Sequence, residues 1–125
     1  MINDDIPVID ITELLAKQLA RTAAARAAGL PALRRLVDVA QRDTGQSRVC
    51  GRLLLGLYNG SAYPFSLVDL RLLDHALWQD CMAVLAMDQC PEKEVHQLIE
   101  DGCAIWDELK AAWTTERDRR AWREA

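Results

Sequence analysis

Apolar residues recur at helical spacing from Ile11 onward. Asp10 and Glu13 have the spacing of a capping box, which marks the start of many helices. The apolar residues behind this cap fall on one helical face: Ile11, Leu14, Leu15 and Leu19. The alanine-rich stretch 20–28 favours helix by propensity, although it offers little surface to bury. The pattern predicts a helix over 10–28, preceded by an extended lead-in at 1–9.

A glycine and a proline interrupt the pattern after this helix. Gly29 suits the C-terminal cap of the first helix. Pro31 suits the first turn of a second helix, which ends before Gly45. The apolar face of that second helix consists of Leu33, Leu36, Val37 and Ala40. The sequence therefore predicts two helices here, separated at 29–31.

The next predicted helix begins at a Ser47 cap and ends at the Asn59-Gly60 turn. Its apolar residues leave almost no polar face: Val49, Cys50, Leu53, Leu54, Leu55, Leu57 and Tyr58. A helix that is apolar all round is normally buried on all sides. We therefore expect this helix to lie at the centre of the fold.

Two further helices are predicted in the second half of the chain. Ser66 and Asp69 have capping-box spacing, and Asp74 is a candidate cap for a second segment of the helix that follows. Pro91 suits the first turn of the last helix. An apolar seam predicts that this helix runs without a break through Gly102: Val95, Ile99, Gly102, Trp106, Leu109 and Trp113.

Helices joined by short connections predict an all-α fold, a compact bundle of four to five helices. The length of 125 residues suits one domain. Within it we distinguish an N-terminal extension with an alanine-rich helix at 1–29, a helical core at 30–113 and a charged C-terminal tail at 114–125.

The net charge of −4 is unevenly distributed. Over residues 69–108, ten carboxylates face only Arg71 and Lys93. Nucleic-acid binding rests on neutralising phosphates, so this acidic stretch disfavours nucleic acid as a general partner and suits a basic protein surface instead. A solvated helix face is the simpler interpretation of the same pattern.

The four cysteines form no CxxC pair, and the N-terminus is acidic where a secretory signal would be basic. No apolar run approaches the length needed to cross a bilayer. The sequence therefore predicts free thiols, a reducing cytoplasmic setting and no membrane association.

Several short motifs resemble a family of uncharacterised small proteins that occur in proteobacterial genomes, often on mobile elements. The motifs are Asp43-Thr44-Gly45-Gln46-Ser47, Leu57-Tyr58-Asn59-Gly60, Tyr63-Pro64-Phe65, and Glu94-Val95-His96 followed by Asp101-Gly102. The resemblance covers about residues 33–113. It implies a bacterial setting and a role on a mobile element, but no activity, because a family label without a characterised site is not a function.

One set of residues is a candidate metal site. Glu92, His96 and Glu100 recur every four residues, with Cys103 three residues later, so one helix face would present them together. Two observations argue against the site: the HExxH and CxxC spacings are absent, and the chain contains only two histidines. Solvated glutamates and a locally bonded histidine are the alternative interpretation.

Candidate partner-binding residues lie elsewhere. Trp78 is a large side chain on a helix that is apolar nearly all round, and tryptophan is enriched at binding hot spots. The tail offers Arg119, Arg120 and Trp122, a composition that suits an acidic partner or RNA, or simply the cationic end of a helix.

The function predicted from these features is that of a non-catalytic protein-interaction module, and the family resemblance implies a mobile-element regulator or inhibitor of a host system. Its partner would be another protein or a second copy of itself, and no catalytic residues or cofactor are predicted. Two alternatives stay open: a metal-dependent protein using Glu92, His96 and Glu100, and nucleic-acid binding through the arginine-rich tail.

Overall fold

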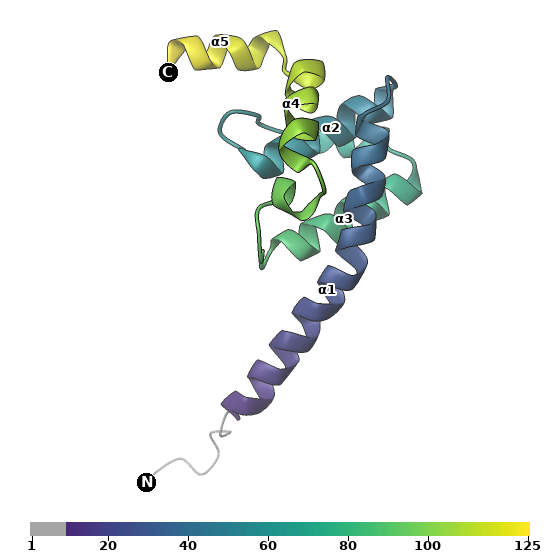
Figure 1. Ribbon diagram of the computed structural model, residues 1–125, viewed down its shortest axis with the longest axis vertical. Helices are drawn as coiled ribbons and strands as arrows, with labels where there is room; N and C mark the ends of the chain where they lie inside the picture. Colours follow the sequence, from purple (N-terminus) through teal and green to yellow (C-terminus); the bar gives the residue numbers. More distant parts are fainter. Residues whose placement is uncertain (1–9) are drawn as a thin grey trace.

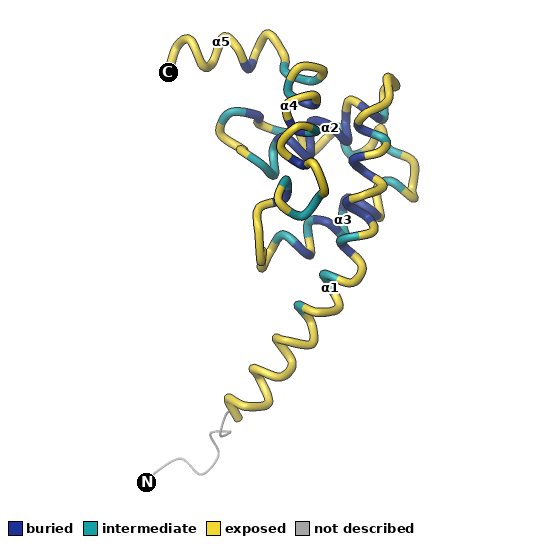
Figure 2. The backbone as a smooth tube through the Cα atoms, in the orientation of Figure 1, coloured by how far each residue is buried: buried dark blue, intermediate teal, exposed yellow. Residues whose placement is uncertain are grey.

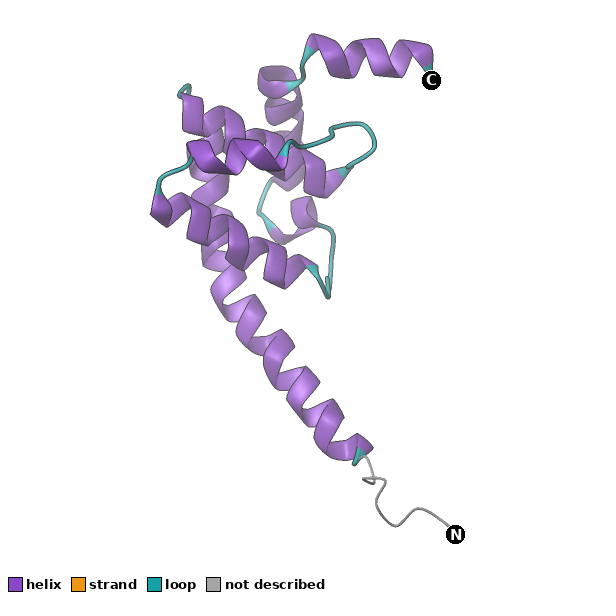
Figure 3. Cartoon of the chain, turned by 180° about the vertical axis from the view of Figure 1, so that it is seen from behind, coloured by secondary structure: helices purple, strands orange, loops and turns teal. Residues whose placement is uncertain are grey.

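The computed structural model describes residues 10–125, and the lead-in predicted at 1–9 lies outside them. Within 10–125 the chain forms five α-helices and two 3-10 helices, and no strand (Figure 3). They are α1 (Ile11–Ala40), α2 (Gly45–Tyr58), η1 (Leu67–Leu72), α3 (His75–Asp88), η2 (Val95–Leu98), α4 (Gly102–Trp113) and α5 (Glu116–Glu124). The prediction of an all-α bundle with short connections is confirmed.

Helix α2 lies at the centre of the body, in contact with α1, α4, η1 and η2. Four of its apolar side chains are completely buried: Val49, Cys50, Leu54 and Leu55. The predicted central position is therefore confirmed, but the predicted cap is wrong. Thr44 caps the helix by accepting a hydrogen bond from the Ser47 amide at 3.0 Å, and Ser47 is itself buried beside the Thr44 hydroxyl.

Helix α1 is one continuous helix of 30 residues, so the predicted break at 29–31 is wrong. Gly29 does not end the helix because it serves as a contact point: a Cβ at this position would lie 2.6 Å from the Met87 Cβ of α3. Pro31 is exposed, and so is Ala27, the residue whose carbonyl loses its helical partner to the proline ring. Water can therefore satisfy that carbonyl, and packing against α3 offsets the remaining cost of the proline.

The segment before α3 is split as the sequence suggested. The Asp74 carboxylate accepts a hydrogen bond from the Leu77 amide at 2.8 Å and caps α3. The other expected cap is wrong, since Ser66 makes no side-chain capping bond and η1 behind it is a single 3-10 segment.

The prediction of one helix from Pro91 to Trp113 is also wrong. The chain forms only the short η2, turns through Asp101 in the left-handed region (φ 58°), and begins α4 at Gly102. The backbone carbonyl of His96 approaches Gly102 so closely that any Cβ there would collide with it. The apolar seam is still used, because Val95, Trp106 and Leu109 are buried, but a turn rather than a helix connects its two halves.

The C-terminal tail is a helix with a firm start. The Thr115 hydroxyl accepts from the Asp118 amide at 3.1 Å, and the Asp118 carboxylate accepts from the Thr115 amide at 2.9 Å. Asp118 is buried against Arg52 of α2, which attaches α5 to the body.

Candidate protein-binding surface

The first half of α1 projects from the body of the molecule (Figure 1). We call residues 11–22 the arm. Figure 2 shows the arm exposed along almost its whole length, in contrast to the second half of the same helix. The exposed fractions of its apolar side chains are 68% for Ile11, 53% for Leu14, 58% for Leu15 and 70% for Leu19.

Local interactions explain why the arm is helical without a core of its own. Asp10 caps the first turn by accepting from the amides of Thr12 and Glu13 at 3.0 and 3.3 Å. Glu13 and Lys17 form an ion pair of 3.3 Å one turn apart. Starting a helix is the costly step, and the arm only extends a helix that is already held by packing. The arm can therefore stay helical while its apolar side chains face water.

The arm repeats the pattern of the half of α1 that packs on α3. Eighteen residues are five turns of a helix, so residues eighteen apart lie on the same line. Each exposed apolar residue of the arm has a buried counterpart at that distance: Ile11 and Gly29, Leu14 and Ala32, Leu15 and Leu33, Leu19 and Val37. The arm thus continues a packing face beyond the point where α3 ends.

The sequence revealed these four apolar residues but not their role as a surface. The signal that identifies the surface is the single apolar line that continues along α1 from Ile11 to Val37. The predicted break at 29–31 hid that line, because it made the first helix independent of the second.

The predicted partner-binding residues are only partly available. Trp78 is 40% exposed, with its ring stacked on His75 at 5.9 Å between centroids. Trp122 is 41% exposed, but its indole N–H donates to the Ala62 carbonyl at 3.0 Å. Arg119 and Arg120 are exposed on α5. The structure does not gather these residues into one patch with the arm.

Arg52 and Asp118 form a buried ion pair, which the sequence did not reveal. The Arg52 guanidinium donates to the two Asp118 carboxylate oxygens at 2.5 and 3.2 Å and to the Pro64 carbonyl at 2.8 Å. Burial alone would raise the pKa of the Asp118 carboxyl, but hydrogen bonds from Arg52 and Thr115 lower it below its ordinary value. A fully paired ion pair of this kind holds helices together and leaves no free group for chemistry.

The residues predicted as a metal site do not share a helix face, because the helix that would align them does not exist. Glu92 is exposed and pairs with Arg26 at 3.5 Å. His96 packs edge-on against the Tyr58 ring, 5.0 Å between centroids, and Glu100 faces solvent. Over residues 10–125, no group of three or more His, Cys, Asp and Glu side chains is placed to hold a metal ion.

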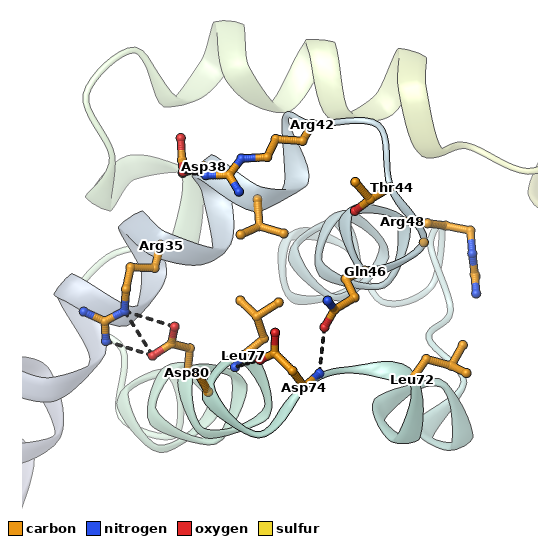
Figure 4. A pocket seen from close by; sticks show the side chains of 13 residues that line it. Arg35, Asp38, Arg42, Thr44, Gln46, Arg48, Leu72, Asp74, Leu77 and Asp80 are labelled. Carbon is orange, nitrogen blue, oxygen red and sulfur yellow. Dashed lines mark hydrogen bonds and ion pairs between the residues drawn. The ribbon is translucent and has the colours of Figure 1, made fainter.

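A hollow of about 870 Å³ opens between the end of α1 and the starts of α2 and α3 (Figure 4). Three arginines and three aspartates line it: Arg35, Arg42, Arg48, Asp38, Asp74 and Asp80. Arg35 holds Asp80 with both Nε and Nη2, and Arg42 holds Asp38. Arg48 pairs with Asp69 at 3.6 Å and Asp74 caps α3, so each of these charged side chains already has a partner.

The cysteines fall into two classes, and all four are free. Cys50 and Cys81 are completely buried, and burial is the main cause that raises the pKa of their thiols to about 11 and about 12. They are therefore inert core residues. Cys90 and Cys103 are exposed.

Residues 30–114 match the family of unknown function DUF7673. The chain belongs to this family. No curated protein and no solved structure matches the chain. The resemblance found in the sequence is thereby confirmed as a family of unknown function, while its bacterial and mobile-element setting stays a prediction.

The DUF7673 region begins at Leu30, in the middle of α1, and ends just before α5. It contains the packed half of α1 and the hollow of Figure 4. The arm and α5 both lie outside it. No helix within the described part of the chain is long and apolar enough to cross a membrane.

Proposed function

We propose that this protein is a non-catalytic protein-binding module, and that the arm of α1 is its binding element. The observation that carries this proposal is the row of four large aliphatic side chains, each more than half exposed, on a helix that extends beyond its own core. Exposed apolar patches of soluble proteins mark interaction sites, because water contact with such a surface is unfavourable.

The character of the surface indicates the kind of partner. The apolar residues lie at i, i+3, i+4 and i+8, the arrangement by which an amphipathic helix packs on another helix or into an apolar groove. Helix α3 already covers the same arrangement five turns later. The expected partner surface is therefore a helix that packs as α3 does.

Site-specific photo-crosslinking in cells tests the proposal. A photoreactive residue at Leu15 lies in the apolar row, whereas the same residue at Ala20 lies about 140° around the helix and serves as the matched control. We expect a discrete adduct from position 15 and little from position 20. Equal labelling from both positions, or no adduct from position 15, would refute the arm as a binding element.

A further inference from the structure

From the direction of α3, the charges of the arm and its repeated pattern, we infer that the arm binds the arm of a second copy of this chain, antiparallel and face to face. This inference rests on the proposed function, which it makes specific by naming the partner. The argument begins with the helix that covers the second half of α1.

Helix α3 packs antiparallel to α1. Asp80, near the start of α3, binds Arg35, whereas Met87, near its end, meets Gly29. Residue numbers thus fall along α1 as they rise along α3. A second helix placed on the arm in the same way would continue the direction of α3 and begin where α3 ends.

The arm of a second copy has the properties that this position requires. Its first residues are a capped helix N-terminus, the positive end of the helix dipole, and they would follow the negative C-terminal end of α3. Its apolar row is identical to the exposed apolar row of the first copy, so the two rows can bury each other. A two-fold antiparallel pair lets each arm cover the other, so the contact is closed and leaves no apolar row unpaired.

Charge on the flank of the arm favours the antiparallel direction. Asp10 and Arg21 are eleven residues apart, which places them within about 20° of the same line along the helix. An antiparallel pair brings Asp10 of each copy near Arg21 of the other, twice. In a parallel two-fold pair the equivalent flanks of the two arms lie on opposite sides of the contact, so Asp10 and Arg21 would not meet.

A small hollow at the end of α3 would receive the first turn of the second copy's arm. It measures about 110 Å³ and is lined by Gln18, Thr22 and Ala25 of α1 and by Met87 of α3, among others. If Ile11 of one copy lies level with Thr22 of the other, its side chain reaches this hollow. In the same register Leu14 of each copy lies level with Leu19 of the other, so the apolar rows overlap from Leu14 to Leu19 and Ile11 extends beyond the overlap to the hollow.

The contact is small. Stable interfaces bury roughly 800 Å² on each partner, and twelve residues of one helix provide less. We therefore expect a dimer in equilibrium with monomer, which dissociates on dilution.

Sedimentation of the purified full-length chain across a concentration series tests the inference. We expect the wild type to shift from monomer to dimer as its concentration rises. Leu15→Asp should stay monomeric, whereas Ala20→Asp, which adds the same charge on the opposite side of the arm, should dimerise like the wild type. A monomer at every concentration, or a dimer that Leu15→Asp leaves intact, would overturn the inference.

Spin-label distances then test the direction of the pair, with the exposed Cys90 and Cys103 replaced by serine. In the antiparallel register the two labels at Ala16 lie at nearly the same level, whereas those at Ala23 are offset along the axis by about 20 Å. Equal distances at both positions would indicate a parallel pair and overturn the inference.

The two proposals fail separately. If the pure chain is monomeric but crosslinking at Leu15 gives an adduct with a different protein, self-pairing is wrong and the arm remains a binding element. If position 15 gives no adduct and the pure chain is monomeric, both are wrong.

Discussion

At the scale of single residues, glycines decide how closely the helices approach. Gly29 and Gly51 are places where a methyl group would meet another side chain, Met87 for the first and Trp113 for the second. Gly102 faces the backbone carbonyl of His96, which cannot move away as a side chain can. The sequence identifies these residues as glycines, but only packing shows that they are contacts rather than helix ends.

Gly29→Ala should lower the free energy of unfolding by roughly 2 kcal/mol, because the new Cβ overlaps the fixed Cβ of Met87 and the helices must separate slightly. Urea denaturation measures this change. Gly45→Ala is the matched control, since no atom lies within 4 Å of its Cβ position, and it should be neutral or slightly stabilising. Similar effects of the two substitutions would contradict the contact role of Gly29.

At the scale of elements, α1 combines two halves with one pattern and two environments. Leu33 is completely buried, whereas Leu15, five turns earlier on the same line, is 58% exposed. The helix backbone does not distinguish them, because both residues lie within one continuous helix. The difference comes from the length of α3, which covers one half and stops.

Leu33→Ala should therefore cost about 3 kcal/mol of stability through a cavity in the core. Leu15→Ala should change stability by less than about 0.5 kcal/mol, as exposed substitutions usually do. Thermal and urea unfolding of dilute protein provide the comparison, since dilution removes any contribution from association. A large loss in Leu15→Ala at high dilution would mean that the arm belongs to the core of its own chain.

At the scale of the whole molecule, one buried ion pair joins the middle of the chain to its end. Arg52 and Asp118 are 66 residues apart, and their side chains are 9% and 2% exposed. Arg52 lies within the DUF7673 region, whereas its partner Asp118 lies outside that region, in the C-terminal helix α5. Deletion of 114–125 would leave a buried guanidinium unpaired, so it is an unsuitable test for binding through the tail.

Asp118→Asn should lower the free energy of unfolding by about 3 kcal/mol at neutral pH, because Arg52 then stays buried without its counter-charge. The folded-state pKa of Asp118 is below its ordinary value of 3.8, so the stabilisation is complete above that value and is lost as the pH falls through the folded pKa. The gap between wild type and variant should therefore be constant near neutral pH and shrink below about pH 4.

Glu116→Gln is the control for this prediction. Glu116 is exposed and pairs with Arg123 at the surface, so its loss should change stability by less than about 1 kcal/mol. A gap between Asp118→Asn and wild type that persists unchanged into strong acid would contradict the role of the ion pair.

The sequence by itself determined the features that depend on neighbours within a few residues. Caps at Asp10 and Asp74, the helical class of the fold and the all-round apolar character of α2 follow from propensity, capping and periodicity. The tertiary structure decided the features that depend on distant segments. Gly29 continues a helix because Met87 lies beside it, and Gly102 begins one because the carbonyl of His96 occupies the space of a side chain.

The candidate site divides in the same way. The spacing of Ile11, Leu14, Leu15 and Leu19 was visible in the sequence, since it is a property of one helix. Whether that face is covered depends on where α3 ends, and no interaction within the arm carries this information. Local chemistry made the arm a helix with an apolar face, and only the packing of the other helices left that face open.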